Sequence, residues 1–232
     1  MRSDLSTMRP LLAGFATRTS TSDGRAADRR PAPFPDAAPV AVDLDELLAE
    51  PHADLRDTLL ARRSSLRYAD EPVRTELVIA LLHAALRRDR LDWRLDDAAG
   101  PVEAFVFAVR SRGLPAGVYR VTAHDCSFLA PVEALGDVED LGVQREFAGA
   151  GGIVAMYASL DRADSWAGPH GYRMSVVRAA AALYDFHLGC QSYGLTGTLF
   201  GGFIAAAVRR LVRGDGVTRH PLLSATYAHP EG

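Results

Sequence analysis

The feature that most constrains the fold of this chain is a long alanine-rich segment in its last third. The segment "GYRMSVVRAAAALYDFHLGCQSYG" covers residues 171–194 and has small or apolar side chains over most of its length. This pattern predicts one long helix, because alanine and unbranched apolar residues have high helix propensity. A helix that is apolar on nearly every side has to be covered by other elements, so we expect it to be almost wholly buried.

The rest of the chain shows helical and strand-like patterns in an irregular order. Strand-like segments are residues 103–109 and 117–121, joined by the turn "RSRGLPAG", and then 151–160 and 222–228. Helical patterns cover residues 43–50, 51–63, 71–90, 132–150 and 204–212, and the second of these opens with Pro51. The order lacks the regular strand–helix alternation of a doubly wound fold. We therefore expect an α+β protein with a mainly antiparallel sheet wrapped by helices.

Residues 1–40 differ in composition from the rest of the chain. They are rich in Ser, Thr, Arg, Ala and Pro and show no sustained apolar period. Such a segment cannot bury enough apolar surface to fold by itself, so we expect a flexible arm, or one that orders only against a partner subunit. The length of 232 residues fits a single further domain, which we place at residues 41–232.

The composition argues against two classes of protein. The formal net charge of −3 gives no overall basic field, which argues against a dedicated nucleic-acid binder. The most apolar stretch, residues 194–208, has about 15 residues and is shorter than the roughly 20 that span a bilayer. The N-terminal apolar run "LLAGFA" is too short for a signal peptide, so we expect a cytoplasmic protein without a membrane partner.

Several possible sites are disfavoured by spacing. Cys126 and Cys190 lie far apart and are best explained as small core residues. The seven histidines are scattered without ligand spacing, so we expect no metal site. The glycines of "GAGGIVAM", residues 149–156, come before a strand rather than between a strand and a helix, which is the wrong order for a dinucleotide-binding turn.

Two segments remain as candidates for binding chemistry. In "ARRSSLRYADEPV", residues 61–73, three arginines and two serines follow a helical run. They suit either a phosphate site, by bidentate contacts, or the basic cap of a helix C-terminus. In "GLTGTLFGGF", residues 194–203, glycines allow backbone N–H groups to approach a ligand, although tight packing explains them equally well.

Taken together, these segments resemble the nitroreductase superfamily of flavin mononucleotide (FMN) enzymes, and most closely its SagB/ThcOx-type branch of azoline dehydrogenases. The family's opening motif matches "RRSSLRYADEPV" without a gap, with Arg62, Arg63, Ser64 and Tyr68 in the matching places. The segments "GVYRVTAHDCSFLAPV", "HGYRMSVVRAAAALYDFHLGCQSYGL" and "GLTGTLFGGF" resemble the family's hairpin, central helix and flavin-edge loop. The resemblance covers about residues 55–228.

The resemblance implies an intertwined homodimer with FMN at the subunit interface. The residues that it implies for cofactor binding are Arg62, Arg63, Ser64, Arg67, Gly100, Gly201 and Gly202. Arg62 and Ser64 would contact the phosphate and ribityl chain, and Gly202 would offer its N–H to flavin N5. Arg67 would replace the third cation of the motif, because Leu66 occupies that position. Gly100 belongs to a shortened form of the family's second flavin-edge loop.

The resemblance further implies an FMN-dependent oxidoreductase that acts on a peptide or amino-acid-derived substrate, as in azoline-to-azole or dehydro-amino-acid formation in natural-product biosynthesis. The Lys-Tyr pair that supplies the base in that branch is replaced here by Trp166 and Ala167. The candidate bases are therefore Asp185, Tyr184 and His170, with a hydrogen-bonded core carboxylate as the alternative for Asp185. Two further hypotheses remain: a flavin-free partner subunit of a peptide-modifying complex, and an NAD(P)H-dependent nitro or quinone reductase.

Overall fold

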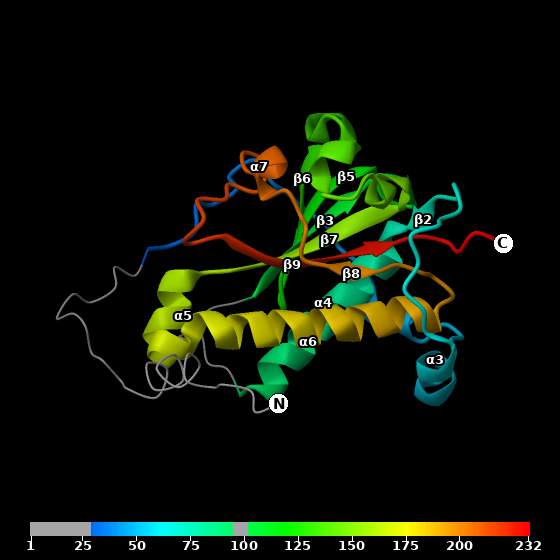
Figure 1. The fold of residues 1–232 in the computed structure, drawn as a ribbon, viewed down its shortest axis with the longest axis horizontal. Coiled ribbons are helices and arrows are strands. Elements are labelled where there is room, and N and C mark those ends of the chain that lie inside the picture. Colours follow the sequence, from blue (N-terminus) through cyan, green and yellow to red (C-terminus); the bar gives the residue numbers. More distant parts are fainter. Residues whose placement is uncertain (1–28, 95–101) are drawn as a thin grey trace, which may run out of the picture.

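The computed structural model describes residues 29–94 and 102–232, and a central antiparallel sheet organises them (Figure 1). The strands are β1 (Ala38–Pro39), β3 (Glu103–Ala108), β5 (Gly117–Val121), β6 (Cys126–Pro131), β7 (Gly152–Ala158), β8 (Leu199–Phe200) and β9 (His220–Tyr227), in the order β1-β6-β5-β3-β7-β9-β8. All neighbouring strands in this sheet are antiparallel. A separate parallel pair joins β2 (Val73–Arg74) to β4 (Ser111–Arg112). The expected α+β class with a mainly antiparallel sheet is confirmed.

Helices cover the two faces of the sheet unequally. The helices are α2 (Leu44–Leu48), α3 (Leu55–Ala61), α4 (Thr75–Asp92), α5 (Leu160–Ala167), α6 (Gly171–Ser192) and α7 (Ala205–Val208), with 3-10 turns η2 (Val132–Leu135), η3 (Val138–Leu141), η4 (Arg145–Gly149) and η5 (Gly168–His170). The long helices α4 and α6 lie under one face, whereas α7 and the turns η2 to η4 lie over the other (Figure 1).

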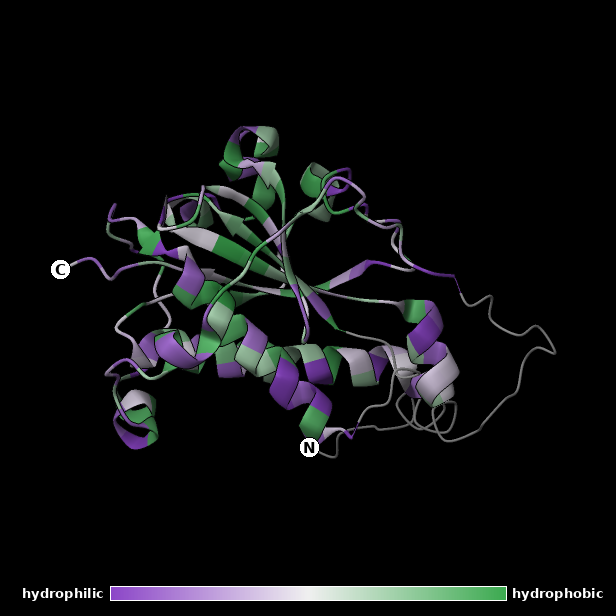
Figure 2. Cartoon of the chain, turned by 180° about the vertical axis from the view of Figure 1, so that it is seen from behind, coloured by the Kyte–Doolittle hydropathy of each residue, from purple (hydrophilic) through white to green (hydrophobic). Residues whose placement is uncertain are grey.

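The alternation of side chains along β3 shows why the sheet is covered on both faces. Ala104 and Val106 belong to the core that α4 and α6 close, whereas Phe105 and Phe107 belong to the core on the opposite face. Successive side chains of a strand point to opposite faces, so a strand that is apolar throughout needs two cores. Each fully buried side chain of this size contributes about 1.5–3 kcal/mol to folding. Apolar residues accordingly run through the sheet and the inner sides of the helices (Figure 2).

The long helix forms where it is expected, but it is not almost wholly buried. Residues such as Leu183 and Phe186 pack under the sheet, while Tyr172, Val177 and Tyr184 remain 54%, 48% and 39% exposed. The expectation of near-complete burial is wrong for the single chain, because the sheet covers only one side of α6. The outer side carries apolar residues that no other element of the described chain covers.

A buried ion pair joins the two long helices. Arg178 on α6 donates from Nε and Nη2 to the two carboxylate oxygens of Asp89 on α4, at 3.2 and 2.8 Å. The two side chains are 1% and 3% exposed. A bidentate pair of this kind fixes the relative position of the helices, because neither charged group is solvated by water if the pair separates.

Several expected boundaries are wrong. The helix expected to open at Pro51 begins at Leu55, since the Asp54 side chain caps it by accepting from the N–H of Asp57. The helix expected over residues 71–90 begins at Thr75, because residues 73–74 pair with β4. The helix expected at residues 204–212 forms only over residues 205–208.

The helix expected over residues 132–150 is absent, and the three 3-10 turns η2, η3 and η4 take its place. Gly136, with a φ of 71°, turns the chain between the first two of them. A 3-10 turn repeats every three residues, so its apolar spacing resembles that of an α-helix. The helix α5 was not expected as a separate element, whereas β5 and β6 pair as the hairpin that the resemblance implies for residues 117–132.

The described part of the expected N-terminal arm, residues 29–40, lies against the same chain. Strand β1 pairs with β6, Ala38 opposite Phe128. Arg219 and Arg213 donate to the backbone carbonyl oxygens of Ala32 and Pro33, each at 2.6 Å. The division of the chain at residue 40 stays a prediction. Across residues 29–94 and 102–232, no helix combines the length and the apolar character needed to cross a bilayer.

Candidate cofactor site

The structure brings the arginine-rich segment and the glycine-rich loop together at one end of the sheet. Ser64 forms a parallel bridge with Gly197, and the N–H of Ser65 donates to the Gly197 carbonyl at 3.1 Å. A few residues later Tyr68 bridges to Pro230, and its hydroxyl lies 2.9 Å from that of Thr226. The two segments that sequence patterns single out are therefore neighbours, although about 130 residues separate them along the chain.

The arginines begin at the end of α3 and do not cap it with their side chains. Arg62 is the C-cap residue and has a ψ of 128°, so the chain leaves the helix there in an extended conformation. Its guanidinium lies over the ring of Tyr184 on α6, 6.0 Å from the centroid. Within the described chain, no guanidinium of Arg62, Arg63 or Arg67 hydrogen-bonds a carbonyl of α3. The last carbonyl groups of α3 therefore receive no side-chain hydrogen bond from these three cations.

These cations also lack counter-charges. Among residues 29–94 and 102–232, no carboxylate forms an ion pair with Arg62, Arg63 or Arg67. The hydroxyl of Ser64 likewise has no partner in this part of the chain, whereas Ser65 is used locally, accepting from the N–H of Arg67 at 3.1 Å. Unpaired guanidiniums beside a free hydroxyl form a donor set that suits a phosphate group.

The motif's third cation position is occupied by an exposed apolar side chain. Leu66 is 42% exposed and contributes no charge. Arg67 beside it is exposed. The positive charge of the segment thus comes from Arg62, Arg63 and Arg67.

The glycine-rich loop runs beside the last strand and ends with free backbone donors. Strand β8 pairs with β9, Leu199 opposite Ala225, so the loop is extended between Gly197 and Gly201. The N–H groups of Gly201 and Gly202 have no hydrogen-bond partner in the described chain. A side chain at Gly201 would meet nothing within 4 Å, whereas one at Gly202 would come 3.1 Å from Val143.

The extended chain around β8 sets the distance between the two halves of the candidate site, which are the cation segment and the free N–H groups. Gly201 and Gly202, with the free N–H groups, come four and five positions after Gly197, which forms the bridge with Ser64. At about 3.3 Å per residue the halves lie roughly 13–17 Å apart along the chain. The cations and the free N–H groups are therefore placed to contact different parts of a ligand.

A histidine that sequence patterns did not single out lies beside the cations. His187 is 2% exposed, and its Nε2 has no hydrogen-bond partner in the described chain. Burial lowers its pKa, and the positive charge of Arg62 lowers it further. Its ring lies nearly parallel to that of Tyr184, with the centroids 6.3 Å apart. The spacing of three residues between Tyr184 and His187 on one helix is the signal that could have identified it.

The three candidate bases are not brought together. Tyr184 lies beside Arg62. Asp185 forms a 3.3 Å ion pair with Arg88, and burial raises its pKa while Arg88 lowers it. It lines a separate pocket of about 390 Å³ between α3, α4 and α6. His170 precedes α6, on the order of 20 Å from Tyr184 at 1.5 Å per residue.

Gly100, the possibility of a metal site and the two cysteines were also considered from the sequence. Gly100 lies outside the described residues. Among those that the structure describes, no group of three His, Cys, Asp or Glu side chains is arranged to hold a metal ion. Cys190 is buried and Cys126 is partly buried, and neither forms a disulfide.

Comparison with solved structures finds several proteins with a similar fold. The chain is similar to a candidate nitroreductase from Anabaena variabilis, at 19% identity and a TM-score of 0.63, over 77% of this chain and 38% of that one. It is similar to a candidate nitroreductase from Ralstonia eutropha, at 18% identity and a TM-score of 0.57, over 88% and 98% of the two chains. This chain thus spans well under half of the Anabaena protein but nearly all of the Ralstonia one.

A third similar structure is the Escherichia coli microcin synthetase McbBCD complex with truncated pro-MccB17 bound. The identity is 14% and the TM-score 0.59, over 98% of this chain and 93% of the matched chain. No protein-family model matches the sequence, and the comparison with curated proteins found no match. At these identities the likeness establishes the fold, which is nitroreductase-like.

Proposed function

We propose that the chain is an FMN-dependent oxidoreductase of the SagB/ThcOx-type branch. One observation carries the proposal: two neighbouring segments both offer unused donors. The first segment has the cations Arg62, Arg63 and Arg67 without ion-pair partners, and the second has the free N–H groups of Gly201 and Gly202. Flavin mononucleotide supplies two-electron chemistry that amino-acid side chains cannot supply. The donor sets at the two halves suit its phosphate and the electron-rich edge of its ring.

Each residue would contact a different part of the flavin according to its position. Arg62 and Ser64 would hold the phosphate, with Arg63 and Arg67 adding positive charge. The N–H of Gly202 would donate to the ring edge, and Gly201 leaves space for a close approach. Tyr184 is the candidate base that lies beside Arg62. The neighbouring His187 has a pKa that burial lowers, and the charge of Arg62 lowers it further. Asp185 is instead paired with Arg88, and His170 lies at the other end of α6.

The proposed substrate is a peptide or an amino-acid derivative, and the proposed setting is a peptide-modifying assembly in the cytoplasm. The likeness to a chain of the McbBCD complex, which was solved with truncated pro-MccB17, supports this proposal. The exposed apolar surface also supports assembly. Leu55 and Leu60 on α3 are 66% and 77% exposed, and Val177 and Tyr184 on the outer side of α6 are uncovered. A homodimer through α3 and α6 would bury these residues beside Arg62.

A second candidate function is a flavin-free partner subunit. It is favoured by Leu66 at the third cation position and by Trp166 in place of the branch's base. The Trp166 ring lies against the Arg178 guanidinium at 5.4 Å and edge-on to Trp93, which is a structural rather than a catalytic position.

Flavin content separates these candidates. We expect the purified protein to be yellow, or the colourless protein to bind added FMN with quenching of flavin fluorescence. Arg62→Gln should weaken binding, whereas Arg87→Gln on the exposed side of α4 should not. Loss of the flavin bands on mixing with NADPH without a peptide substrate would instead support a nitro or quinone reductase. A protein that takes up no FMN would support the partner-subunit function.

A further inference from the structure

A second pocket lies at the opposite end of the sheet from the proposed cofactor site. It has a volume of about 430 Å³ and is walled on one side by the N-terminal segment, at Arg30, Pro31 and Phe34. Its floor is formed where β3 begins, where β5 and β7 end, and just before β9 begins. Six residues of β9 separate this end from Thr226 at the cofactor end, roughly 20 Å at 3.3 Å per residue.

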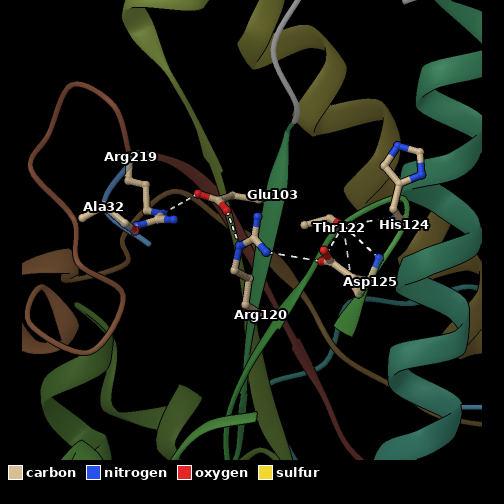
Figure 3. Close-up of polar contacts among 7 residues, drawn as sticks. All are labelled: Ala32, Glu103, Arg120, Thr122, His124, Asp125 and Arg219. Carbon is tan, nitrogen blue, oxygen red and sulfur yellow. Dashed lines mark hydrogen bonds and ion pairs between the residues drawn. The ribbon is translucent and has the colours of Figure 1, made fainter. Parts of the chain in front are cut away.

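The floor of this pocket is a buried charge network (Figure 3). Glu103 accepts from Nε of Arg219 at 2.5 Å and from Nε of Arg120 at 2.6 Å. Arg219 is 3% exposed and also donates to the carbonyl of Ala32, while Arg120 reaches Asp125 at 3.3 Å. One buried carboxylate thus holds two guanidiniums in fixed orientations toward the pocket.

Donor capacity is left over after these bonds. The bonds of Arg120 and Arg219 use Nε and Nη1, and the Nη2 amino groups form no hydrogen bond with a described residue. Arg30 at the rim forms no ion pair with any described residue. Arg162 also lines the pocket, and Glu103 is the one carboxylate residue among the described residues that line it.

The remaining walls supply hydroxyls and an apolar surface. Ser127, Ser159 and Thr218 contribute hydroxyl groups. Phe34 contributes an aromatic wall that is itself held in place, with the Arg219 guanidinium 4.5 Å from its centroid. Fixed guanidiniums beside an apolar wall match an anion that carries a ring or a hydrocarbon body.

We propose that this pocket binds a small organic anion, with a carboxylate or phosphate group on the guanidiniums of Arg30, Arg120 and Arg219 and an apolar body against Phe34. The N-terminal segment forms one wall, so the ligand would also fasten this segment to the sheet. The site is separate from the flavin site and does not depend on it.

Titration of the full chain with benzoate, phenyl phosphate and benzyl alcohol, followed by calorimetry at constant ionic strength, tests the proposal. Benzoate or phenyl phosphate should bind saturably, and which of the two binds tighter identifies the preferred anion. The neutral benzyl alcohol should bind at least about tenfold more weakly, because it lacks the charge-assisted bonds.

Two arginine variants locate the binding. Arg30→Gln should weaken anion binding about tenfold, since a charge-assisted bond is lost from the rim of the pocket. The matched control Arg210→Gln removes an exposed arginine outside the pocket and should leave binding unchanged. No saturable binding of either anion, or equal binding by the Arg30→Gln variant, would overturn the proposal. Thermal unfolding of both variants checks that they fold.

Discussion

Both ends of the sheet carry arginines, but these arginines are paired with a carboxylate at one end and unpaired at the other. At the Glu103 end the guanidiniums of Arg120 and Arg219 share a buried carboxylate. At the Ser64 end Arg62, Arg63 and Arg67 have no carboxylate partner in the described chain. A buried guanidinium without a counter-charge is strongly destabilising, so the first set has to be paired for the chain to fold. The second set is more exposed, which allows it to stay unpaired and available to a ligand.

This difference separates arginines whose pairing the fold requires from arginines that the fold leaves unpaired. Removing the buried carboxylate at the Glu103 end should lower stability. Substitutions at the Ser64 end should leave stability nearly unchanged and alter binding.

The largest effect is expected for Glu103→Gln. The substitution keeps the shape but leaves Arg219 buried with its charge unpaired, so the free energy of unfolding should fall by about 3–5 kcal/mol. Urea denaturation measures it. The control is Asp70→Asn, which affects an exposed carboxylate 3.6 Å from Arg110 and should change stability by less than about 1 kcal/mol. Equal losses in the two variants would show that the buried network does not stabilise the fold.

The next effect concerns binding rather than stability. Arg62→Gln should weaken FMN binding by about 10- to 150-fold, the range of a lost charge-assisted hydrogen bond of about 1.5–3 kcal/mol. Its free energy of unfolding should stay within about 0.5 kcal/mol of the wild type, because the side chain is partly exposed and unpaired. Fluorescence titration and urea denaturation give the two numbers. A large loss of stability with unchanged FMN affinity would reverse the roles assigned to the two ends.

A smaller, pH-dependent effect is expected at Asp215, in the loop before β9. Burial raises the pKa of this carboxyl, but bonds from the Thr218 hydroxyl and from the N–H groups of residues 217–219 outweigh it and lower the pKa to about 2. The folded-state pKa lies below the usual value, so the stabilisation is present above about pH 4 and is lost as the pH falls toward 2.

Asp215→Asn should therefore lower the free energy of unfolding by about 1 kcal/mol at neutral pH, the usual net value of such bonds. The difference from the wild type should stay constant between about pH 5 and 8 and narrow below about pH 4. Urea denaturation across this range measures it. A difference that grows on acidification would contradict the sign of the pKa shift.

The smallest effect is expected for Leu66→Arg, which restores a cation at an exposed position. FMN binding should tighten by about two- to fivefold, the effect of an exposed charge interaction of about 0.5–1 kcal/mol, and stability should hardly change. Leu91→Arg, at another exposed leucine in the last turn of α4, serves as the matched control. Equal tightening in both variants would indicate a general charge effect rather than a cation position at residue 66.

Regular elements could be predicted from the sequence where one period runs without interruption. The strand β3 and the helix α6 follow directly from apolar patterns. The segment at residues 132–150 was mistaken for a helix because 3-10 turns space apolar residues almost as an α-helix does. The extent of burial of α6 could not be predicted, because the pattern shows that a helix is apolar but not whether the same chain covers it.

The candidate site was predictable only in part. Arg62 and Ser64 stood out by composition and by the family motif, and so did Gly201 and Gly202. Their proximity depends on the pairing of Ser64 with Gly197, which no local pattern encodes. His187 was missed because a single histidine in an apolar helix has the same appearance whether its ring is used or merely buried. The network around Glu103 joins residues from four separate segments and was invisible for the same reason.

The visible absorption spectrum of the purified chain, with the flavin released and counted per chain, shows whether the chain holds FMN. We expect flavin bands and about one FMN per chain after incubation with excess FMN and removal of the unbound cofactor. We also expect Arg62→Gln to retain less FMN than Arg87→Gln under the same washing. A folded protein that retains no FMN, or retains it equally in both variants, would contradict the assignment of Arg62 and its neighbours to a flavin phosphate.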